Sequence, residues 1–246
     1  MVDILKKGDI MRIGIFDSGI GGINVLSCLR RKYPNNDYIY FGDTKNLPYG
    51  DKTKKELYEL GKEAIEFLLT KNVDIIIVAC GTISSNCYKD LKKEYPIPIY
   101  DIISPTINYL KESELDNIGV VGTNRTIESN IFDIPEKTVK MKATPSFVPI
   151  IENNQINEKE EDIINELIDF KDSDILVLGC THYPSLKEVI DTLNIKTLDM
   201  GEVLANSIKI DNVGNGTCEL YFSLISVNLI KNINQILGND YQIYAK

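Results

Sequence analysis

Two cysteines hold matching positions in this chain of 246 residues. Cys80 ends the segment Asp74-Ile-Ile-Ile-Val-Ala-Cys, and Cys180 ends Asp174-Ile-Leu-Val-Leu-Gly-Cys, 100 residues later. Each cysteine follows a short apolar run typical of a buried strand and precedes small polar residues and a segment compatible with a helix. Backbone N–H groups at a strand-to-helix turn stabilise anions, so both thiols lie where a thiolate or a bound carboxylate is favoured.

Two thiols that face one carbon from opposite sides could invert a stereocentre. One thiolate would remove the α-proton while the other cysteine, as a thiol, delivers a proton to the opposite face, without a cofactor. A cysteine hydrolase is the competing use of a reactive cysteine, but it needs a base and an acyl substrate. The chain has one histidine, His182, which allows at most one Cys–His pair.

Cysteine usage also bears on the alternatives. The five cysteines form an odd set without a CxxC pair, which argues against a disulfide framework and a structural zinc site. Free thiols indicate a reducing cytoplasm. A free cysteine can also pack as a small hydrophobe, and we prefer that interpretation for Cys28, Cys87 and Cys218, which lack the strand-end position.

A glycine-rich segment, Asp17-Ser-Gly-Ile-Gly-Gly22, follows the first predicted strand and opens a helical stretch. It lacks the GxGxxG spacing of a dinucleotide site and the lysine of a P-loop, so neither is indicated. Its amides and the Ser18 hydroxyl could hold a carboxylate, and Asp17 could pair with an ammonium group. A helix N-cap formed by Asp17 and Ser18 is an equally good explanation.

Three further features have structural explanations that the residues alone leave open. Pro48-Tyr-Gly50 has the residues of a turn. His182, two residues after Cys180, could act beside that thiol or be a satisfied structural imidazole. Glu152 ends the apolar run Phe147–Ile151, and from this spacing we interpret it as a solvated loop carboxylate.

Short β-branched runs alternate along the chain with longer segments of helical period. The predicted strands are Arg12–Phe16, Tyr38–Phe41, Asp74–Ala79, Ile97–Tyr100, Asn117–Val121, Ser146–Ile150, Asp174–Leu178 and Ile195–Leu198. The spacing of apolar residues predicts helices over Lys54–Leu69 and Glu158–Phe170. This alternation indicates an α/β fold with parallel sheets that are covered on both faces.

The strand that precedes each matched cysteine belongs to a longer internal repeat. Ile13–Ser18 is echoed by Ile118–Thr123, and Ile99–Asp101 by Thr197–Asp199, in the same order and at nearly the same offset. Such a series suggests a duplicated α/β unit, and so two similar lobes with a cleft between them. Ligands of open α/β sheets bind beyond the carboxyl ends of the strands, which is where the two matched thiols lie.

The overall composition excludes several classes of protein. Lys and Arg total 27 against 36 Asp and Glu, a net charge of -9, which argues against nucleic-acid binding through phosphate neutralisation. There is no apolar run of about 18 residues, so no membrane span is expected. Met1–Met11 carries several charges and no apolar run like that of a secretory signal. A small metabolite in the cytoplasm is the expected partner.

The ordered motifs resemble those of the glutamate racemases, in the cofactor-independent aspartate/glutamate racemase superfamily. The motifs are Asp17-Ser-Gly-Ile-Gly-Gly, Pro48-Tyr-Gly, Ala79-Cys-Gly-Thr82, Phe147-Val-Pro and Gly179-Cys-Thr-His-Tyr-Pro184. The similarity extends from about Arg12 to the Leu220–Ser223 segment and the C-terminal helix. The Gly-Cys-Thr-His-Tyr-Pro block is its most specific part.

The resemblance implies two Rossmann-like (flavodoxin-like) lobes, with residues 11–104 and 211–246 in the first and residues 105–210 in the second. It also implies interconversion of L- and D-glutamate for peptidoglycan, with no cofactor and no metal, and it allows a homodimer. Cys80 and Cys180 would be the acid–base pair, assisted by Asp17, Glu152 and His182. The residues expected to contact the substrate are Asp17, Ser18, Tyr49, Gly50, Gly81, Thr82, Thr123, Thr181 and His182.

One residue departs from the family pattern. The family has Asn after the first cysteine, whereas this chain has Gly81, which keeps the backbone N–H but loses the side-chain amide. A lost hydrogen bond to a charged group is worth about 1.5–3 kcal/mol, so we expect weaker binding or slower turnover. The alternatives are a racemase of another acidic amino acid, such as aspartate, and a homologue that binds amino acids without turnover.

Overall fold

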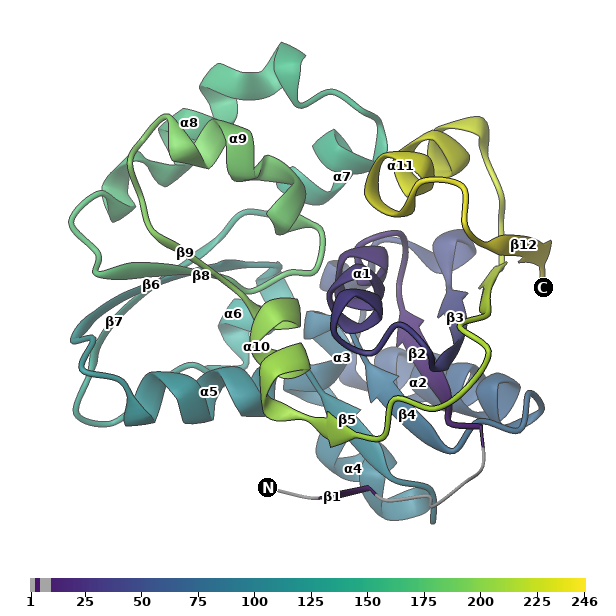
Figure 1. Cartoon of the computed structure of the whole chain (residues 1–246). Helices are drawn as coiled ribbons and strands as arrows, with labels where there is room; N and C mark the ends of the chain where they lie inside the picture. The colour runs from purple at the N-terminus through teal and green to yellow at the C-terminus, as the bar shows by residue number, and fades with distance from the viewer. Residues whose placement is uncertain (1–2, 5–9) are drawn as a thin grey trace.

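The computed structural model describes residues 3–4 and 10–246, so much of Met1–Met11 lies outside the described residues. Two parallel sheets dominate the structure (Figure 1). The first has the order β12-β11-β3-β2-β4-β5 and the second β7-β6-β8-β9. We call each sheet, with its helices, the first and the second lobe. A two-stranded sheet pairs β1 (Asp3–Ile4) with β10 (Lys209–Ile210).

The strands of the first lobe are β2 (Arg12–Asp17), β3 (Asp37–Gly42), β4 (Ile75–Val78), β5 (Ile99–Asp101), β11 (Cys218–Phe222) and β12 (Gln242–Ala245). Those of the second lobe are β6 (Asn117–Gly122), β7 (Thr138–Ala143), β8 (Ile175–Leu178) and β9 (Thr197–Asp199). The α-helices are α1 (Gly22–Lys32), α2 (Lys54–Leu69), α3 (Gly81–Asn86), α4 (Tyr88–Glu94), α5 (Ile103–Glu112), α6 (Asn124–Glu128), α7 (Phe147–Glu152), α8 (Glu160–Leu167), α9 (Lys187–Asp191), α10 (Met200–Ser207) and α11 (Val227–Leu237). Short 3-10 helices are η1 (Thr44–Asn46), η2 (Tyr49–Asp51), η3 (Asn157–Lys159), η4 (Ile168–Phe170) and η5 (Tyr183–Leu186).

The internal repeat of the sequence reappears as a repeat of topology. Strand order β3-β2-β4-β5 in the first lobe corresponds to β7-β6-β8-β9 in the second. Asp74 accepts a hydrogen bond from the backbone N–H of Arg12 at 2.9 Å, and Asp174 accepts one from that of Asn117 at 2.8 Å. The two aspartates therefore tie the start of the neighbouring strand in the same way, and the predicted α/β fold with two similar lobes is confirmed.

Burial of both sheet faces explains the continuous apolar strands. One face of each sheet contributes to a shared cluster that includes Ile15 and Val177 and continues into α1, α5 and α10. The opposite faces pack against separate helices, with Val78 beneath α2 and Leu178 close to α8 and α9. A strand buried on both faces has no polar alternation, as parallel sheets require.

Local signals positioned several helices correctly. Helix α2 is capped by Thr53, whose Oγ1 accepts from the Glu56 N–H while the Glu56 carboxylate accepts from the Thr53 N–H. This capping box satisfies two N–H groups that the helix itself leaves without partners. The predicted helix Glu158–Phe170 is present as α8 flanked by η3 and η4.

The predicted strand Ser146–Ile150 is wrong. Residues Phe147–Glu152 form α7, and β7 (Thr138–Ala143) is the strand that pairs with β6. The apolar run of α7 is buried on several sides, and a short buried run does not distinguish a helical turn from a strand. Strand β7 was missed because it lies at the sheet edge and carries lysines, which are common on exposed edges.

After the second lobe the chain returns to the first. Strand β11 pairs with β3, β12 pairs with β11, and α11 packs against α1 and α7 (Figure 1). This pairing supports the division into residues 11–104 with 211–246 and residues 105–210, whose boundaries stay a prediction. Within the described part of the chain, no helix has the length and apolar character that crossing a bilayer requires.

Candidate active site

The carboxyl ends of strands from both lobes open onto one cavity of about 320 Å³. All the residues that we predicted for the site, except Asp17, line this cavity. They are Ser18, Tyr49, Gly50, Cys80, Gly81, Thr82, Thr123, Glu152, Cys180, Thr181 and His182. Residues spread over more than 160 positions of the chain therefore meet because matched strands end at the same cleft.

The two cysteines reach the cavity from opposite lobes. Cys80 follows β4 and is the N-cap of α3, whereas Cys180 follows β8 and precedes η5. Each packs against the core of its own lobe, yet both line the same cavity. The side chains are almost fully buried, so they can meet only a molecule that enters this space.

Cys80 has a neutral and an anionic neighbour. Its Sγ donates to the Ser18 Oγ at 3.7 Å. The pKa of the Cys80 thiol is raised to about 12. Burial is the largest cause, and the nearby Asp17 carboxylate is the second. At neutral pH, without a ligand, Cys80 is therefore a thiol that can give a proton.

Cys180 lies instead beside an imidazole. The Cys180 Sγ is 3.6 Å from His182 Nδ1, and His182 Nε2 is 2.7 Å from Glu152 Oε1. Burial lowers the pKa of His182, but the hydrogen bonds with Cys180 and Glu152 outweigh it and raise the pKa well above 6.5. This direction favours the imidazolium form, in which Nδ1–H faces the sulfur.

Glu152 is not the solvated loop carboxylate that its spacing suggested. It ends α7, and its Oε1 accepts from the Ile20 N–H at 3.3 Å as well as contacting His182. Ile20 belongs to the first lobe and His182 to the second, so this one oxygen joins the glycine-rich turn to the imidazole. His182 lines the cavity, as an action beside Cys180 requires, and that role stays a prediction.

Asp17 lies behind the cavity wall. It is fully buried, its Oδ2 accepts from the Gly19 N–H at 3.0 Å, and its Oδ1 accepts from the Thr181 hydroxyl at 3.2 Å. The N-cap of α1 is Gly21, so the N-cap interpretation of Asp17 and Ser18 is wrong. A direct pairing of Asp17 with a substrate ammonium does not fit this position either. The Asp17 carboxylate acts on the site by raising the pKa of Cys80 and by accepting a hydrogen bond from the Thr181 hydroxyl.

Hydroxyl groups line the side of the cavity between α3 and α6. Thr82 Oγ1 lies 3.0 Å from Thr123 Oγ1, across the two lobes. Thr123 is the N-cap of α6 and also accepts from the Thr126 N–H. The Tyr49 hydroxyl donates to Asp43 at 2.7 Å, and Tyr49 also lines the cavity.

Sequence reasoning missed some of the wall. Asn124, Pro145, Val148 and Asn153 also line the cavity. Asn124 was within reach of the repeat, because it follows Thr123 as Gly19 follows Ser18. The others lie on or beside α7, which was predicted as a strand, and only Val148 lay in a motif quoted for the resemblance, Phe147-Val-Pro.

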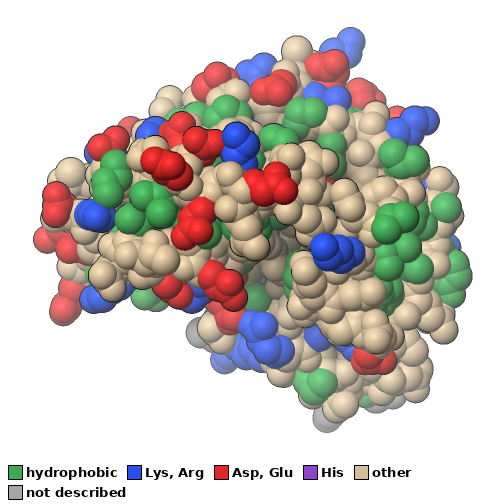
Figure 2. Space-filling view, turned by 90° about the horizontal axis from the view of Figure 1, so that it is seen from above, with side chains coloured by type: hydrophobic (Ala, Val, Ile, Leu, Met, Phe, Trp, Pro, Cys, Tyr) green, Lys and Arg blue, Asp and Glu red, His purple; other side chains and the backbone are tan. Residues whose placement is uncertain are grey.

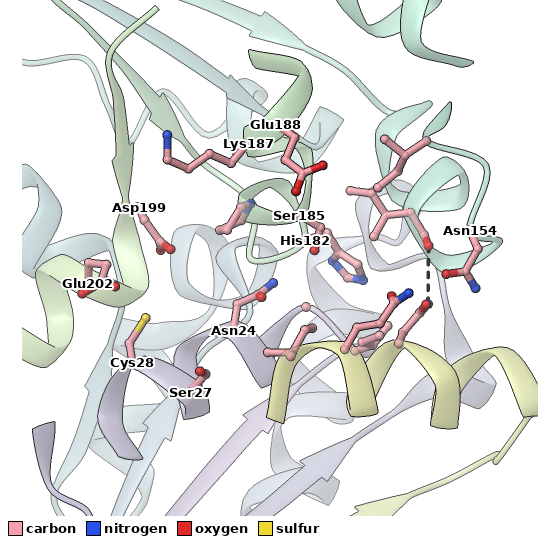
Figure 3. Close-up of a pocket in the computed structure, with 18 of the residues that line it drawn as sticks. Asn24, Ser27, Cys28, Asn154, His182, Ser185, Lys187, Glu188, Asp199 and Glu202 are labelled. Atoms are coloured by element: carbon pink, nitrogen blue, oxygen red, sulfur yellow. Dashed lines mark hydrogen bonds between the residues drawn. The ribbon is translucent and has the colours of Figure 1, made fainter. Parts of the chain in front are cut away.

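A second cavity of about 660 Å³ lies on the other side of His182 (Figure 3). Its walls come from α1, α11, η5 and neighbouring segments, and they include Cys28, Lys187, Glu188 and Glu202. Neither matched cysteine lines it.

The surface between the two lobes is hollowed when the molecule is seen from above (Figure 2). No group of three His, Cys, Asp or Glu side chains among the described residues has the arrangement of a metal site.

The chain resembles known racemases over most of its length. The family model described as Asp/Glu/Hydantoin racemase matches residues 30–208. The chain is 40% identical over 244 residues to a protein of Aquifex aeolicus named glutamate racemase, covering 94% of this chain and 96% of the relative. A relative with the same name from Hydrogenobaculum sp. is 38% identical over 247 residues, covering 95% of each.

Solved structures with the same fold agree with these relatives. The glutamate racemase of Aquifex pyrophilus superposes with a TM-score of 0.80 at 37% identity, covering 96% of this chain and 98% of that one. The glutamate racemase of Francisella tularensis, solved in complex with D-glutamate, has a TM-score of 0.83 at 28% identity and 96% coverage of both chains.

Proposed function

The chain belongs to the Asp/Glu/hydantoin racemase family, and we propose that it interconverts L- and D-glutamate without a cofactor, using Cys80 and Cys180. One observation carries this proposal. The two cysteines end matched strands of different lobes, and both line one cavity of about 320 Å³. A small amino acid held between them would present its α-carbon to one sulfur on each side.

The reaction exchanges the protonation states of the two sulfurs. When Cys180 acts as base, its thiolate takes the α-proton, the C–H bond breaks, and the electron pair is delocalised into the substrate carboxylate. Cys80 then gives its thiol proton to the opposite face of the carbon, which inverts the centre. The product leaves with Cys80 as thiolate and Cys180 as thiol, and the reverse reaction starts from that state.

The neighbours of each sulfur favour the state in which Cys180 is a thiolate and Cys80 is a thiol. The pKa of Cys80 is raised to about 12 by burial and by Asp17, so Cys80 holds its proton. A protonated His182 at 3.6 Å from the Cys180 sulfur compensates a negative charge there. We propose that Glu152 keeps the imidazole protonated and oriented, through the 2.7 Å contact with Nε2.

The remaining wall would hold the polar ends of the substrate. We propose that the hydroxyls of Ser18, Thr82, Thr123 and Thr181 and the Gly81 N–H bind its carboxylates, with Tyr49 and Gly50 closing the cavity. Oriented hydroxyls and amides can bind anions in a protein that is acidic overall. Hydrogen bonds to the α-carboxylate also stabilise the charge that develops when the α-proton leaves.

Glutamate is the proposed substrate because the relatives at 38–40% identity are named glutamate racemases and align along nearly the whole chain. The proposed role is supply of D-glutamate for peptidoglycan. The homodimer that the resemblance implies stays a prediction, which sedimentation velocity checks.

The test uses the purified full chain with no added cofactor. L- and D-glutamate and L- and D-aspartate are each incubated with it in deuterated buffer, and optical activity and Cα deuteration are followed together. We expect glutamate to racemise from either side, with deuterium appearing as each molecule inverts. Conversion of aspartate alone would show that aspartate, and not glutamate, is the substrate. Binding of glutamate without conversion would reject the proposal that the protein is a racemase.

A further inference from the structure

Three glycines of the first lobe lie where an added side chain would clash with the second lobe. A Cβ added at Gly19 would lie 2.7 Å from Glu152 Oε1, and one added at Gly21 would meet the side chains of Thr181 and His182. A Cβ added at Gly81 would lie 2.7 Å from the backbone carbonyl oxygen of Gly179. The first two obstacles are side-chain ends, which can rotate, but the third is backbone.

The Gly179 carbonyl cannot easily give way. The Gly179 N–H donates to the Val121 carbonyl at 2.7 Å, which holds this residue to strand β6. A Cβ added at Gly179 would lie 2.6 Å from that same Val121 oxygen, so the backbone of Gly179 packs closely against the end of β6. A side chain at position 81 would therefore push one lobe away from the other rather than displace a single group.

This contact lies directly beside both reacting sulfurs. Gly81 follows Cys80, and Gly179 precedes Cys180, so the close approach joins the two residues adjacent to the thiols. We propose that the Gly81–Gly179 contact sets the separation of the two thiols, and that Gly81 is a positioning residue of this chain. The inference rests on the proposed racemisation, in which both sulfurs must reach one carbon.

The proposal changes the meaning of the departure from the family pattern. Position 81 was expected to have lost a useful amide group, so that Gly81→Asn would improve the enzyme. In this structure an Asn at position 81 has the same 2.7 Å conflict at its Cβ as any other side chain. The two interpretations predict opposite effects for one substitution.

The experiment compares Gly81→Ala, Gly81→Asn and the control Gly122→Ala. Gly122 ends β6 and precedes Thr123, which lines the cavity, and the atoms nearest to a Cβ there belong to Thr126 and Ile127, at 3.4 Å and within its own lobe. A displacement approaching 1 Å between reacting groups can cost about 100-fold, so we expect kcat of Gly81→Ala to fall about 10- to 100-fold. We expect KM to change less than about 3-fold, because the binding groups remain, and kcat of Gly122→Ala to stay within about 2-fold.

A second readout separates thiol spacing from general damage. If the sulfurs are too far apart, one can still remove the α-proton while the other fails to protonate the opposite face. Solvent deuterium should then appear in the unreacted enantiomer of Gly81→Ala, whereas in the wild type it appears in the product. Gly81→Asn should be at least as slow as Gly81→Ala.

Three outcomes would overturn the proposal: wild-type kcat for Gly81→Ala, faster turnover for Gly81→Asn, or a lowered kcat without exchange in the unreacted enantiomer. A wild type that racemises neither glutamate nor aspartate rejects the proposed function instead. In that case, or if Gly81→Ala does not fold, crystal structures decide the spacing. The contact of Gly81 with the Gly179 oxygen must persist in the wild type with glutamate bound, and its absence there overturns the inference.

Discussion

Cys80 and Cys180 occupy equivalent positions in the two lobes, but their surroundings differ. Cys80 contacts a hydroxyl and lies near the buried carboxylate of Asp17, whereas Cys180 contacts an imidazole that is held by Glu152. The repeat thus places two similar sulfurs at equivalent positions, and side chains that differ between the lobes give Cys80 an anionic neighbour, Asp17, and Cys180 an imidazole neighbour, His182.

This difference has a limit set by thermodynamics. L- and D-enantiomers have equal free energies, so kcat/KM must be equal in both directions whatever the surroundings of the sulfurs. The asymmetry can appear only in kcat and KM taken separately, and in the exchange of single enantiomers. The experiments below use those quantities.

Removing either thiol should have the largest effect. We expect Cys80→Ala and Cys180→Ala each to lose racemisation by at least about 1,000-fold, since positioned acids and bases contribute about 100- to 10,000-fold each. Each variant keeps one sulfur, so each should still exchange the α-proton of one enantiomer, slowly and without inversion. Proton NMR in deuterated buffer should show that the two variants exchange opposite enantiomers.

The same experiment can contradict the comparison. Exchange of the same enantiomer by both variants would mean that the sulfurs do not lie on opposite faces. Cys87→Ala is the control for loss of a buried thiol outside the cavity, and it should racemise at the wild-type rate.

Loss of the imidazole charge should have a smaller, direction-dependent effect. His182→Gln removes the cation beside Cys180, so we expect kcat to fall about 10- to 100-fold in the direction that uses Cys180 as base. That direction is the one whose substrate Cys80→Ala still exchanges. The reverse kcat should fall less, and kcat/KM should remain equal in both directions in steady-state assays.

Glu152→Gln is the milder companion variant. It keeps a hydrogen-bonding group near His182 Nε2 and removes the negative charge, so we expect about a tenfold loss or less, with the same directional bias. Equal losses of kcat in both directions for both variants would show that His182 acts on the fold of the site and not on one sulfur.

On the other side of the site, the pKa of Cys80 should respond to its two neighbours in opposite directions. Asp17→Asn should lower the pKa of Cys80 from about 12, but not to 9.0, because burial is the larger cause. Ser18→Ala should raise it, because the Ser18 hydroxyl can donate to the thiolate. The pH dependence of alkylation at Cys80, followed by mass spectrometry, measures both. A shift in the same direction for the two variants would contradict these assignments.

The smallest effect concerns stability at alkaline pH. Folding raises the pKa of Cys80 from 9.0 to about 12. The contribution of the Cys80 thiol to the free energy of unfolding is therefore complete below pH 9 and is lost as the pH rises through about 12. Above pH 9 each such thiol lowers the free energy of unfolding by up to about 1.4 kcal/mol per pH unit. The urea midpoint should therefore fall between pH 9 and 11, and less steeply for Cys80→Ser. An identical slope in that variant would place the pH dependence on the other buried thiols.

Local patterns predicted much of the scaffold. The strands around the matched cysteines, the helix after Thr53 and the order of the repeat follow from apolar runs and residue spacing. These signals work because each depends on neighbours in the chain. The same reasoning failed at α7, where four buried apolar residues in a short run suit a helix or a strand equally well.

The candidate site was likewise predictable where residues depend on local order, and not where they depend on distant contacts. Cys80, Cys180 and the glycine-rich turn could be proposed from their strand-end positions, and the family resemblance added Glu152. Spacing alone assigned Glu152 to solvent, because its partners Ile20 and His182 are far away in the chain. The position of Asp17 behind the wall was likewise out of reach, since it depends on a contact with Thr181 in the other lobe.

The sequence by itself determined the repeated strands, the two thiols at their ends and the presence of glycine at position 81, since all of these depend on residue type and local order. Only the tertiary structure decided which charge each thiol meets and how closely the lobes approach at Gly81 and Gly179. The physical reason is that electrostatic interactions and steric contacts act through space. In this protein they join Asp17 to Thr181, 164 positions apart, and Glu152 to His182, 30 positions apart, although His182 itself is only two positions from Cys180.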